Sequence, residues 1–481
     1  MNRMSFWLAA IVCFAGVGGL FHLDRNRSLR TSWALWLPVV WLWIVGSRPI
    51  SQWLGIWLGI NLGPPVQNRD AQLDGSPADA LVFAVLLLVG IVVLLQRGRR
   101  TRALLRASLP ILIYFTYCLL SVLWSPYPGV AFKRWIKDIG DLVMVLVVAT
   151  EAQPIAALRR LFSRVGFILL PASVLLIRYS DVGRGYDRNG FPTNTGVTTN
   201  KNTLGLMVFI LSLGALWSFC TIFRARRTPN RNRQLLAQGT VLTFGVALLA
   251  MAHSATSVAC FALGGTLILA TALPSVGRRP RAVHALMLSI LLVGGLTMLF
   301  GGEGTVAHAL GRKTDFTGRT EIWKAVIPTV PNEIIGAGFE SFWISPSVEK
   351  VWQNLPSWFS VKGLNTAHNG YIEIYLNLGW VGVCLIVVIL IGAYWRTVSA
   401  FRSDPKIGGL ALAYTASVAI YSITEAGFRM LTPTWIFLLL AIVSAGGTVS
   451  EYSALKRRSC VRHDLANVAA GPFLQLIQKN N

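Results

Sequence analysis

Long apolar runs alternate with short polar segments along almost the whole chain. A helix of roughly 20 apolar residues is long enough to cross the hydrocarbon core of a bilayer. The runs are continuously apolar and do not alternate residue by residue, so they predict membrane-spanning helices and not barrel strands. The segment 50–62 is rich in Trp and Gly and too short to span, which predicts an interfacial segment. The expected spans are 5–21, 32–46, 79–96, 107–124, 136–150, 161–177, 203–222, 235–252, 255–274, 283–300, 370–394, 407–424 and 430–447.

Arginine placement orients these spans. Clusters such as those at Arg25, Arg97 and Arg159 fall on one side of the predicted membrane, which the positive-inside rule makes cytoplasmic. The N-terminus is then external and the polar tail 451–481 is cytoplasmic, following a membrane domain over 1–450. The external side receives the segments 47–78, 125–135 and 178–202, the large loop 301–368 and the turn around Glu425.

Composition supports an all-α polytopic membrane protein of about 12 to 13 spans. Of the 481 residues 54% are hydrophobic and 13% charged, whereas a soluble domain has about 25% charged residues. The net charge of +24 is divided among short basic clusters between apolar runs. That distribution is typical of a membrane protein held among lipids and argues against a nucleic-acid partner.

External cations are the first candidate chemistry. Arg184, Arg188 and Lys201 lie among Gly, Asn and Thr in 178–202, against the positive-inside trend, and indicate an anionic ligand such as a phosphate. The alternative is a solvated loop whose cations meet lipid headgroups. In TGRTEIWKAV, residues 317–326, Thr320 is expected to cap a short helix whose apolar face lies on the bilayer, with Arg319 at its start. The alternative is a surface helix with an incidental arginine.

The segment 366–382, TAHNGYIEIYLNLGWVG, closes the large loop and begins the next span. His368 and Tyr371 are expected on one helical face, and Asn369 and Glu373 on another. The macrodipole at a helix N-terminus disfavours protonated histidine, so His368 is a candidate base near pH 7. The alternative is a structural histidine at the membrane interface, hydrogen-bonded to a loop carbonyl. The spacing does not match the H-E-x-x-H pattern of a zinc site.

Four boxes in the same order resemble the O-antigen ligase and polymerase superfamily. They are the HNGYIE box with its following G-W-x-G, the upstream GRTEIW box, the KNTLG segment at 201–205 and the early SRPISQWLG run. That early run and AFKRWIKDIGDL, residues 131–142, which contains Arg134, most resemble the exopolysaccharide polymerase branch.

The resemblance implies a glycosyltransferase C-like membrane fold with one large periplasmic loop in the bacterial inner membrane. The donor would be a polyprenyl-diphosphate-linked glycan and the acceptor a glycan, lipid or protein, with polysaccharide export proteins as further partners and no cofactor. His368 matches the family's functional histidine and Arg319 its loop arginine, while either Arg184 or Arg188 matches the earlier one. Arg134 and Lys201 join the predicted diphosphate-binding set, and the predicted orienting residues are Asn369, Tyr371 and Glu373.

The residues themselves are consistent with this chemistry. Fixed cations can neutralise a departing diphosphate, whereas the carboxylates Asp70, Asp74 and Asp79 are too scattered to predict a metal. A base at His368 and direct displacement predict inversion at the anomeric carbon. The resemblance to the exopolysaccharide polymerase branch favours polymerisation over ligation. The competing class is a transporter or flippase that uses intramembrane acids, for which the candidates are Asp138, Asp141 and Glu425.

Overall fold

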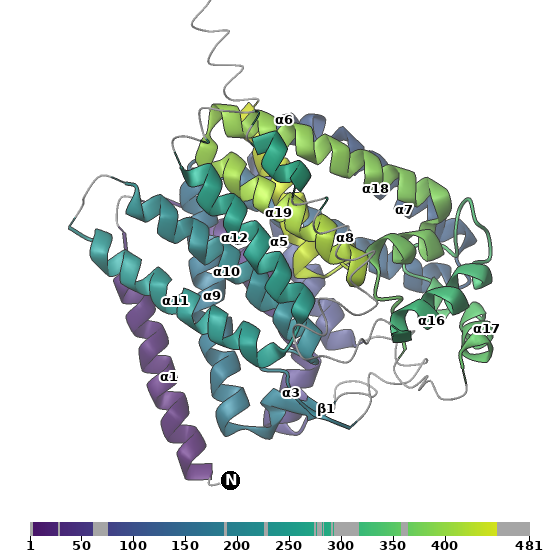
Figure 1. Cartoon of the computed structure of the whole chain (residues 1–481), viewed down its shortest axis with the longest axis horizontal. Helices are drawn as coiled ribbons and strands as arrows, with labels where there is room; N and C mark the ends of the chain where they lie inside the picture. The colour runs from purple at the N-terminus through teal and green to yellow at the C-terminus, as the bar shows by residue number, and fades with distance from the viewer. Residues whose placement is uncertain are drawn as a thin grey trace, which may run out of the picture.

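The computed structural model is a bundle of long helices with one two-stranded hairpin (Figure 1). It describes residues 3–26, 29–60, 76–186, 190–225, 229–273, 317–356 and 364–449, with 276, 281, 283–289 and 292. The main helices are α1 Arg3–Leu23, α2 Trp36–Val45, α3 Ile50–Leu58, α5 Pro77–Gln96, α6 Gly98–Ala107, α7 Leu109–Leu120, α8 Pro128–Ala149, α9 Pro154–Tyr179, α10 Lys201–Phe223, α11 Arg231–Ala252, α12 Ala255–Ala272, α16 Thr317–Val326, α17 Ser347–Asn354, α18 Gly370–Ser403 and α19 Pro405–Thr424.

The prediction of a polytopic helical membrane protein is confirmed. Within the described residues eight helices are long and apolar enough to cross a membrane, or up to ten if each of two bent pairs is one span. The pair that contains α2 and α3 bends by 67°, which makes the predicted interfacial segment the second half of a candidate broken or re-entrant span. The pair that contains α6 and α7 bends by 84°. The predicted span 283–300 and the tail 451–481 lie largely or wholly outside the described residues.

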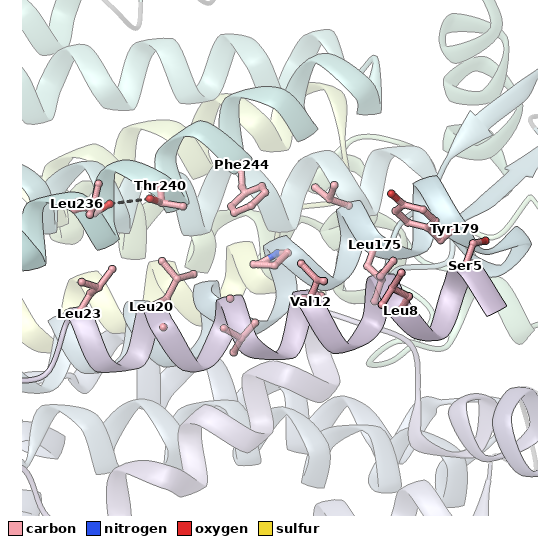
Figure 2. A pocket seen from close by; sticks show the side chains of 17 residues that line it. Ser5, Leu8, Val12, Leu20, Leu23, Leu175, Tyr179, Leu236, Thr240 and Phe244 are labelled. Atoms are coloured by element: carbon pink, nitrogen blue, oxygen red, sulfur yellow. Dashed lines mark hydrogen bonds between the residues drawn. The ribbon is translucent and has the colours of Figure 1, made fainter. Parts of the chain in front are cut away.

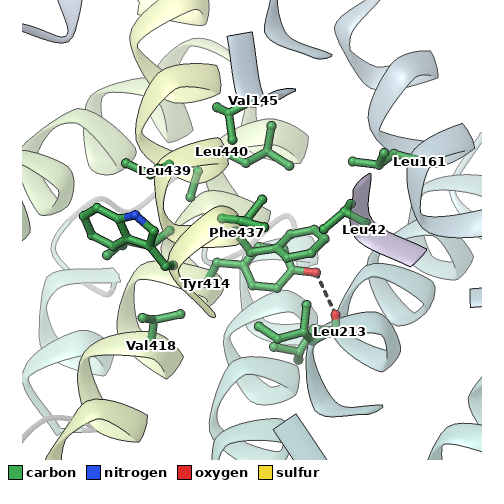
Figure 3. Close-up of a cluster of buried hydrophobic side chains, with 14 of the residues drawn as sticks. Leu42, Val145, Leu161, Leu213, Tyr414, Val418, Phe437, Leu439 and Leu440 are labelled. Atoms are coloured by element: carbon green, nitrogen blue, oxygen red, sulfur yellow. Dashed lines mark hydrogen bonds between the residues drawn. The ribbon is translucent and has the colours of Figure 1, made fainter. Parts of the chain in front are cut away.

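The centre of the bundle is formed by α9, α10, α19 and the apolar helix Pro433–Val449. Phe162, Tyr414 and Phe437 stack there, with ring centroids 5.5 Å apart for Phe162–Phe437 and 5.2 Å for Tyr414–Phe437. The Tyr414 hydroxyl donates to the Ile210 carbonyl at 2.8 Å, so the one polar atom of the stack is satisfied (Figure 3). The outer helices α1 and α5 keep many apolar side chains exposed, as lipid-facing helices do.

The large loop has a small core of its own. Ile322 and Val326 on α16 pack with Phe342, Val351 and residues of α18. The apolar face of α16 is therefore buried against protein. The prediction that this face lies on the bilayer is wrong. The helix also begins at Thr317, so Thr320 lies inside it and is not its cap. In Figure 1, α16 and α17 gather at the right of the bundle, on the side opposite α1.

A kink in α18 seats this loop core on the bundle. Gly379 has φ +63° inside the helix, and a Cβ there would lie 2.2 Å from the Ile334 carbonyl carbon. Only glycine allows both this backbone and this close approach. The loop then donates two backbone bonds to α18, from Ala337 to the Leu376 carbonyl at 3.0 Å and from Gly338 to the Asn377 carbonyl at 2.8 Å.

Candidate functional site

Asn369 defines where α18 begins and where His368 lies. The Asn369 side chain accepts from the backbone N–H groups of Tyr371 at 2.9 Å and Ile372 at 3.1 Å, as an N-cap does. Its amide donates to the Ile423 carbonyl at 2.9 Å, which ties the start of α18 to the end of α19. His368 precedes the cap in a left-handed conformation with φ 49°. His368 therefore does not share a helical face with Tyr371, because the extended cap residue separates it from the helix.

Two buried groups hold the backbone next to His368. Glu373, which is 2% exposed, accepts from the Ala367 N–H at 2.5 Å and from the Trp343 indole at 2.9 Å. The Trp323 indole donates to the Ala367 carbonyl at 2.8 Å. Ala367, the residue before His368, is thus held through both its N–H and its C=O. Glu373 therefore contacts the Ala367 backbone. Among the described residues, no hydrogen bond joins the Glu373 carboxylate to the His368 imidazole.

Tyr371 lies on the bundle side of α18. Its hydroxyl donates to the Ala419 carbonyl at 3.1 Å, and its ring packs edge-on to Phe428 with centroids 5.2 Å apart. Asn369, Tyr371 and Glu373 therefore fix the backbone around His368. In the part of the chain that the structure describes, their side-chain hydrogen bonds go to backbone groups and to Trp343, not to the imidazole.

Glu425 is the centre of the polar cluster at this end of the bundle. It follows α19, is 7% exposed, and its Oε2 lies 3.1 Å from Nδ1 of His368. Its Oε1 accepts from the Arg319 guanidinium at 2.7 Å and from the Asn202 amide at 3.2 Å. Three segments far apart in sequence therefore converge on the carboxylate of a fourth. We call His368, Glu425, Arg319 and Asn202 the Glu425 cluster.

The cluster leaves one imidazole nitrogen for chemistry. When Nδ1 donates its proton to the Glu425 carboxylate, Nε2 carries a lone pair and can accept a proton. The His368 side chain is 22% exposed and that of Arg319 is 23% exposed, so both reach the surface while Glu425 stays covered. A base oriented by a buried carboxylate, with a guanidinium beside it, can remove a proton near a negatively charged group.

Sequence reasoning missed the role of Glu425. The sequence does show an acid in the short turn between two predicted spans. That turn lies on the same predicted side of the membrane as His368 and Arg319. The link between them depends on how α10, α16, α18 and α19 pack, which spacing along the chain does not reveal.

A second cluster contains the predicted residue Arg134 and the unpredicted Arg429. Arg429 forms an ion pair with Glu340 at 2.9 Å and donates to the Asn365 carbonyl at 3.2 Å, while Arg134 donates to the Glu340 carbonyl. Burial by itself would lower the pKa of Arg429. The negative charges of Glu340 and Glu373 raise it by more, so the pKa of Arg429 lies above its usual value. Arg429 therefore stays charged. This Glu340 cluster joins α8, the large loop and the segment before His368.

The other predicted cations are distributed over the same end of the bundle. Lys201 begins α10 and directly precedes Asn202 of the Glu425 cluster. Arg184 in β1 (Arg184–Tyr186), which pairs with β2 (Pro192–Asn194), donates from Nε to the Ile177 carbonyl at 2.8 Å and from Nη2 to the Arg178 carbonyl at 3.1 Å. Arg184 thus caps the end of α9 and lines a separate small pocket with Asn194 and His253. Arg188 lies outside the described residues.

The acids considered for a metal or for transport have other partners. Asp79 accepts from the Ser51 hydroxyl at 2.5 Å, while Asp70 and Asp74 lie outside the described residues. Asp138 and Asp141 are fully buried and accept from the indoles of Trp435 at 2.8 Å and Trp41 at 2.7 Å. Among the side chains that the structure describes, no group of three His, Cys, Asp or Glu residues is placed to hold a metal ion.

Comparison with known proteins connects this site to a family. Residues 239–387 match the family model described as O-antigen ligase, a range that contains Arg319 and His368. The chain is also 23% identical over 345 residues to the "Exopolysaccharide production protein ExoQ" of Rhizobium meliloti (strain 1021), covering 70% of this chain and 76% of that protein. The resemblance predicted from the sequence boxes is thus confirmed: the chain is similar to the O-antigen ligase family over residues 239–387, and over most of its length to a protein of exopolysaccharide production.

Proposed function

We propose that this protein is a membrane glycosyltransferase of surface polysaccharide biosynthesis. It transfers an oligosaccharide from a polyprenyl-diphosphate-linked donor to an acceptor hydroxyl at the periplasmic face of the inner membrane. The observation that carries the proposal is the Glu425 cluster, in which a carboxylate orients a partly exposed histidine beside an arginine. The relative named for exopolysaccharide production favours polymerisation of repeat units over ligation.

The reaction follows from the roles these groups can take. Nε2 of His368 accepts the proton of the acceptor hydroxyl as the hydroxyl oxygen attacks the anomeric carbon. The bond from that carbon to the diphosphate oxygen breaks, and its electron pair leaves with the diphosphate. Attack opposite the leaving group inverts the configuration at the anomeric carbon. Glu425 stabilises the imidazolium that forms, because its carboxylate is already bonded to Nδ1.

The positive charges near the cluster suit the leaving group. A departing diphosphate gains negative charge in the transition state, and fixed cations can stabilise it without a metal ion. Arg319 lies within the cluster, and Lys201 adjoins it through Asn202. Arg319 also holds the Glu425 carboxylate in place, so it supports the base and the leaving group together.

The reaction type can be tested with purified protein in detergent. We expect the protein to consume a polyprenyl-diphosphate-linked oligosaccharide, release the polyprenyl diphosphate and form a longer or newly attached glycan, with or without EDTA. A transporter has no gradient or second compartment in detergent, so its substrate would remain intact. Unchanged substrate in detergent, combined with movement of the same lipid across vesicles, would replace the proposal with a flippase. Activity abolished by EDTA and restored by magnesium would exclude the fixed-cation mechanism.

A further inference from the structure

A cationic cavity lies at the opposite, predicted cytoplasmic end of the bundle. Its volume is about 280 Å³, and it lies where α1 ends against the first turns of α9. Arg25, Arg159, Arg160 and Arg164 line it, and Asp24 is the one acidic residue in the lining. The lining therefore has a strong excess of positive charge, far from the Glu425 cluster.

Two of these arginines have buried donor atoms without hydrogen-bond partners. Arg159 is 9% exposed, its Nε has no partner, and its Nη2 makes a 3.4 Å contact with the Gln234 side chain. Nη1 of Arg164 is also buried without a partner, and its guanidinium carbon lies 4.1 Å from the centre of the Trp36 ring. A buried donor without an acceptor is costly.

The hydrogen bonds of Arg159 and Arg160 go to neutral groups, and the Asp24 carboxylate acts on both arginines through its charge, without a direct bond. Arg160 donates to the Thr31 hydroxyl at 2.6 Å and to the Leu29 carbonyl. Asp24 accepts from the Gln238 amide at 3.2 Å. Within the described parts of the chain, Arg159, Arg160 and Arg164 form no ion pair with an acid. An anion in the cavity would supply the acceptors that these guanidinium groups lack.

An apolar groove runs away from this cavity through the bundle surface. It is bounded by α1 and α11, with α9 between them, and has a volume of about 820 Å³ (Figure 2). That size is within the range of about 300–1,000 Å³ found for small-molecule sites. Figure 2 shows Leu23 and Leu236 at one end of the groove and Ser5 and Tyr179 at the other.

The groove and the cavity are neighbours on α1. Leu20 and Leu23 line the groove, whereas Phe21 and Asp24 line the cavity. A molecule with a negative head and apolar tails would therefore place its head among the arginines and its tails along α1. Basic pockets between spanning helices at the cytoplasmic side are known to hold anionic lipid headgroups.

We propose that the cavity and the groove together bind one anionic phospholipid of the cytoplasmic leaflet. Its phosphodiester lies between Arg159 and Arg164, whose planar guanidinium groups can each hold two phosphate oxygens. Its acyl chains occupy the groove from Leu23 inward. A soluble phosphate would fill the cavity and leave the groove unused, so the two features together favour a lipid.

The headgroup half of the proposal can be tested by native mass spectrometry of the purified full-length protein. Phosphatidylglycerol and phosphatidylcholine are offered in equal amounts, and bound lipid is measured for wild type, Arg164→Gln and Arg106→Gln. Arg106 is an exposed arginine of α6 outside the cavity lining and serves as the matched control. We expect preferential retention of phosphatidylglycerol, weakened about fivefold by Arg164→Gln and unchanged by Arg106→Gln. Equal retention of the two lipids by wild type would overturn the proposal.

The tail half is tested with a matched pair of glycines. Gly19 lines the groove and Gly18 does not, and a Cβ at either would meet open space. Gly19→Phe should therefore fill the groove and lower retention of phosphatidylglycerol, while Gly18→Phe should leave it unchanged. Glycerol 3-phosphate is the soluble probe. If it raises the unfolding temperature of wild type and Gly19→Phe alike, and phosphatidylglycerol adds nothing, the site takes a soluble anion and the lipid proposal is wrong.

Discussion

Two buried carboxylate sites in this protein differ in the donors that they contact. Glu425, at the predicted external end, accepts from the ionisable groups Arg319 and His368, whose side chains are partly exposed. Asp138 and Asp141, inside α8, accept from indole and backbone N–H groups and are fully buried. An acid in or near a spanning helix is a candidate for function at both sites. Of the two sites, only that of Glu425 has a histidine partner, His368, that could exchange a proton.

The difference shows that an acid in or next to a spanning segment has to be judged by its partners. Asp138 bonds α8 to Trp435 on the last helix, and Asp141 bonds it to Trp41 on α2 and to the Leu431 backbone at 2.8 Å. Leu431 has φ 52° and follows Arg429 of the Glu340 cluster by two residues. The aspartates therefore connect α8 to α2, to the last helix and to the segment that carries Arg429.

Replacement of His368 is expected to have the largest effect on transfer. Asparagine tolerates the left-handed backbone of this position, so His368→Asn removes the imidazole with little change in the fold. Loss of a general base typically lowers a rate by about 10²–10⁴-fold. Turnover of the lipid-linked oligosaccharide should fall by that amount, while the unfolding temperature in detergent should be unchanged.

His253 provides the control for this substitution. It also has a positive φ, of 50°, and lies at the end of α11 outside the Glu425 cluster. His253→Asn should retain most of the wild-type turnover. If His368→Asn also retains more than about a third of it, His368 is not the base.

The aspartates of α8 should affect stability and leave the chemistry intact. Each oxygen of Asp141 accepts one N–H group, whereas the described bonds of Asp138 use one oxygen. Asp141→Asn replaces an acceptor by a donor and should lower the free energy of unfolding by about 1–3 kcal/mol. Asp138→Asn keeps an acceptor for Trp435 and should cost less. Thermal unfolding in detergent compares the two, and equal losses would show that burial, not bonding, sets their contribution.

Arg319→Lys should have a smaller effect than loss of the base, although it retains the charge. Lysine cannot reproduce the planar set of donors that a guanidinium presents to a carboxylate and a phosphate. We expect turnover to fall by about tenfold, as judged from initial rates at saturating donor. Normal rates for both Arg319→Lys and Arg319→Ala would assign Arg319 to the surface of the loop and remove it from the site.

Much of the fold could be predicted from the sequence because lipid imposes a strong constraint. A bilayer requires each span to be a long apolar helix, so α5, α10 and α12 were located within a few residues. The breaks between α2 and α3 and between α6 and α7 are local bends, and hydropathy does not distinguish them from straight spans or surface segments. The burial of α16 depends on a loop core whose members are distant in the sequence.

The site was predictable only in part, for the same reason. His368 and Arg319 lie in recognisable boxes, and the structure brings both to one carboxylate. Glu425 lies in no box, and its link to them is made by ion pairs across the fold, with Arg319 of α16 and with His368 just before α18. Arg134 was predicted with the other cations, and its position on α8 brings its guanidinium to the Glu340 carbonyl, a contact that spacing along the chain does not reveal.

The coupling between His368 and Glu425 is measured most directly by a double-mutant cycle on transfer rates. Glu425→Gln alone should lower turnover at least about tenfold, because its amide can donate to Nδ1 and place the imidazole proton on Nε2. If Glu425 acts by orienting the imidazole, it has nothing left to orient once the imidazole is gone. The double variant should then turn over at the rate of His368→Asn alone, within about twofold. Losses that multiply in the double variant would contradict this, and Glu425 would have a role of its own, separate from the histidine.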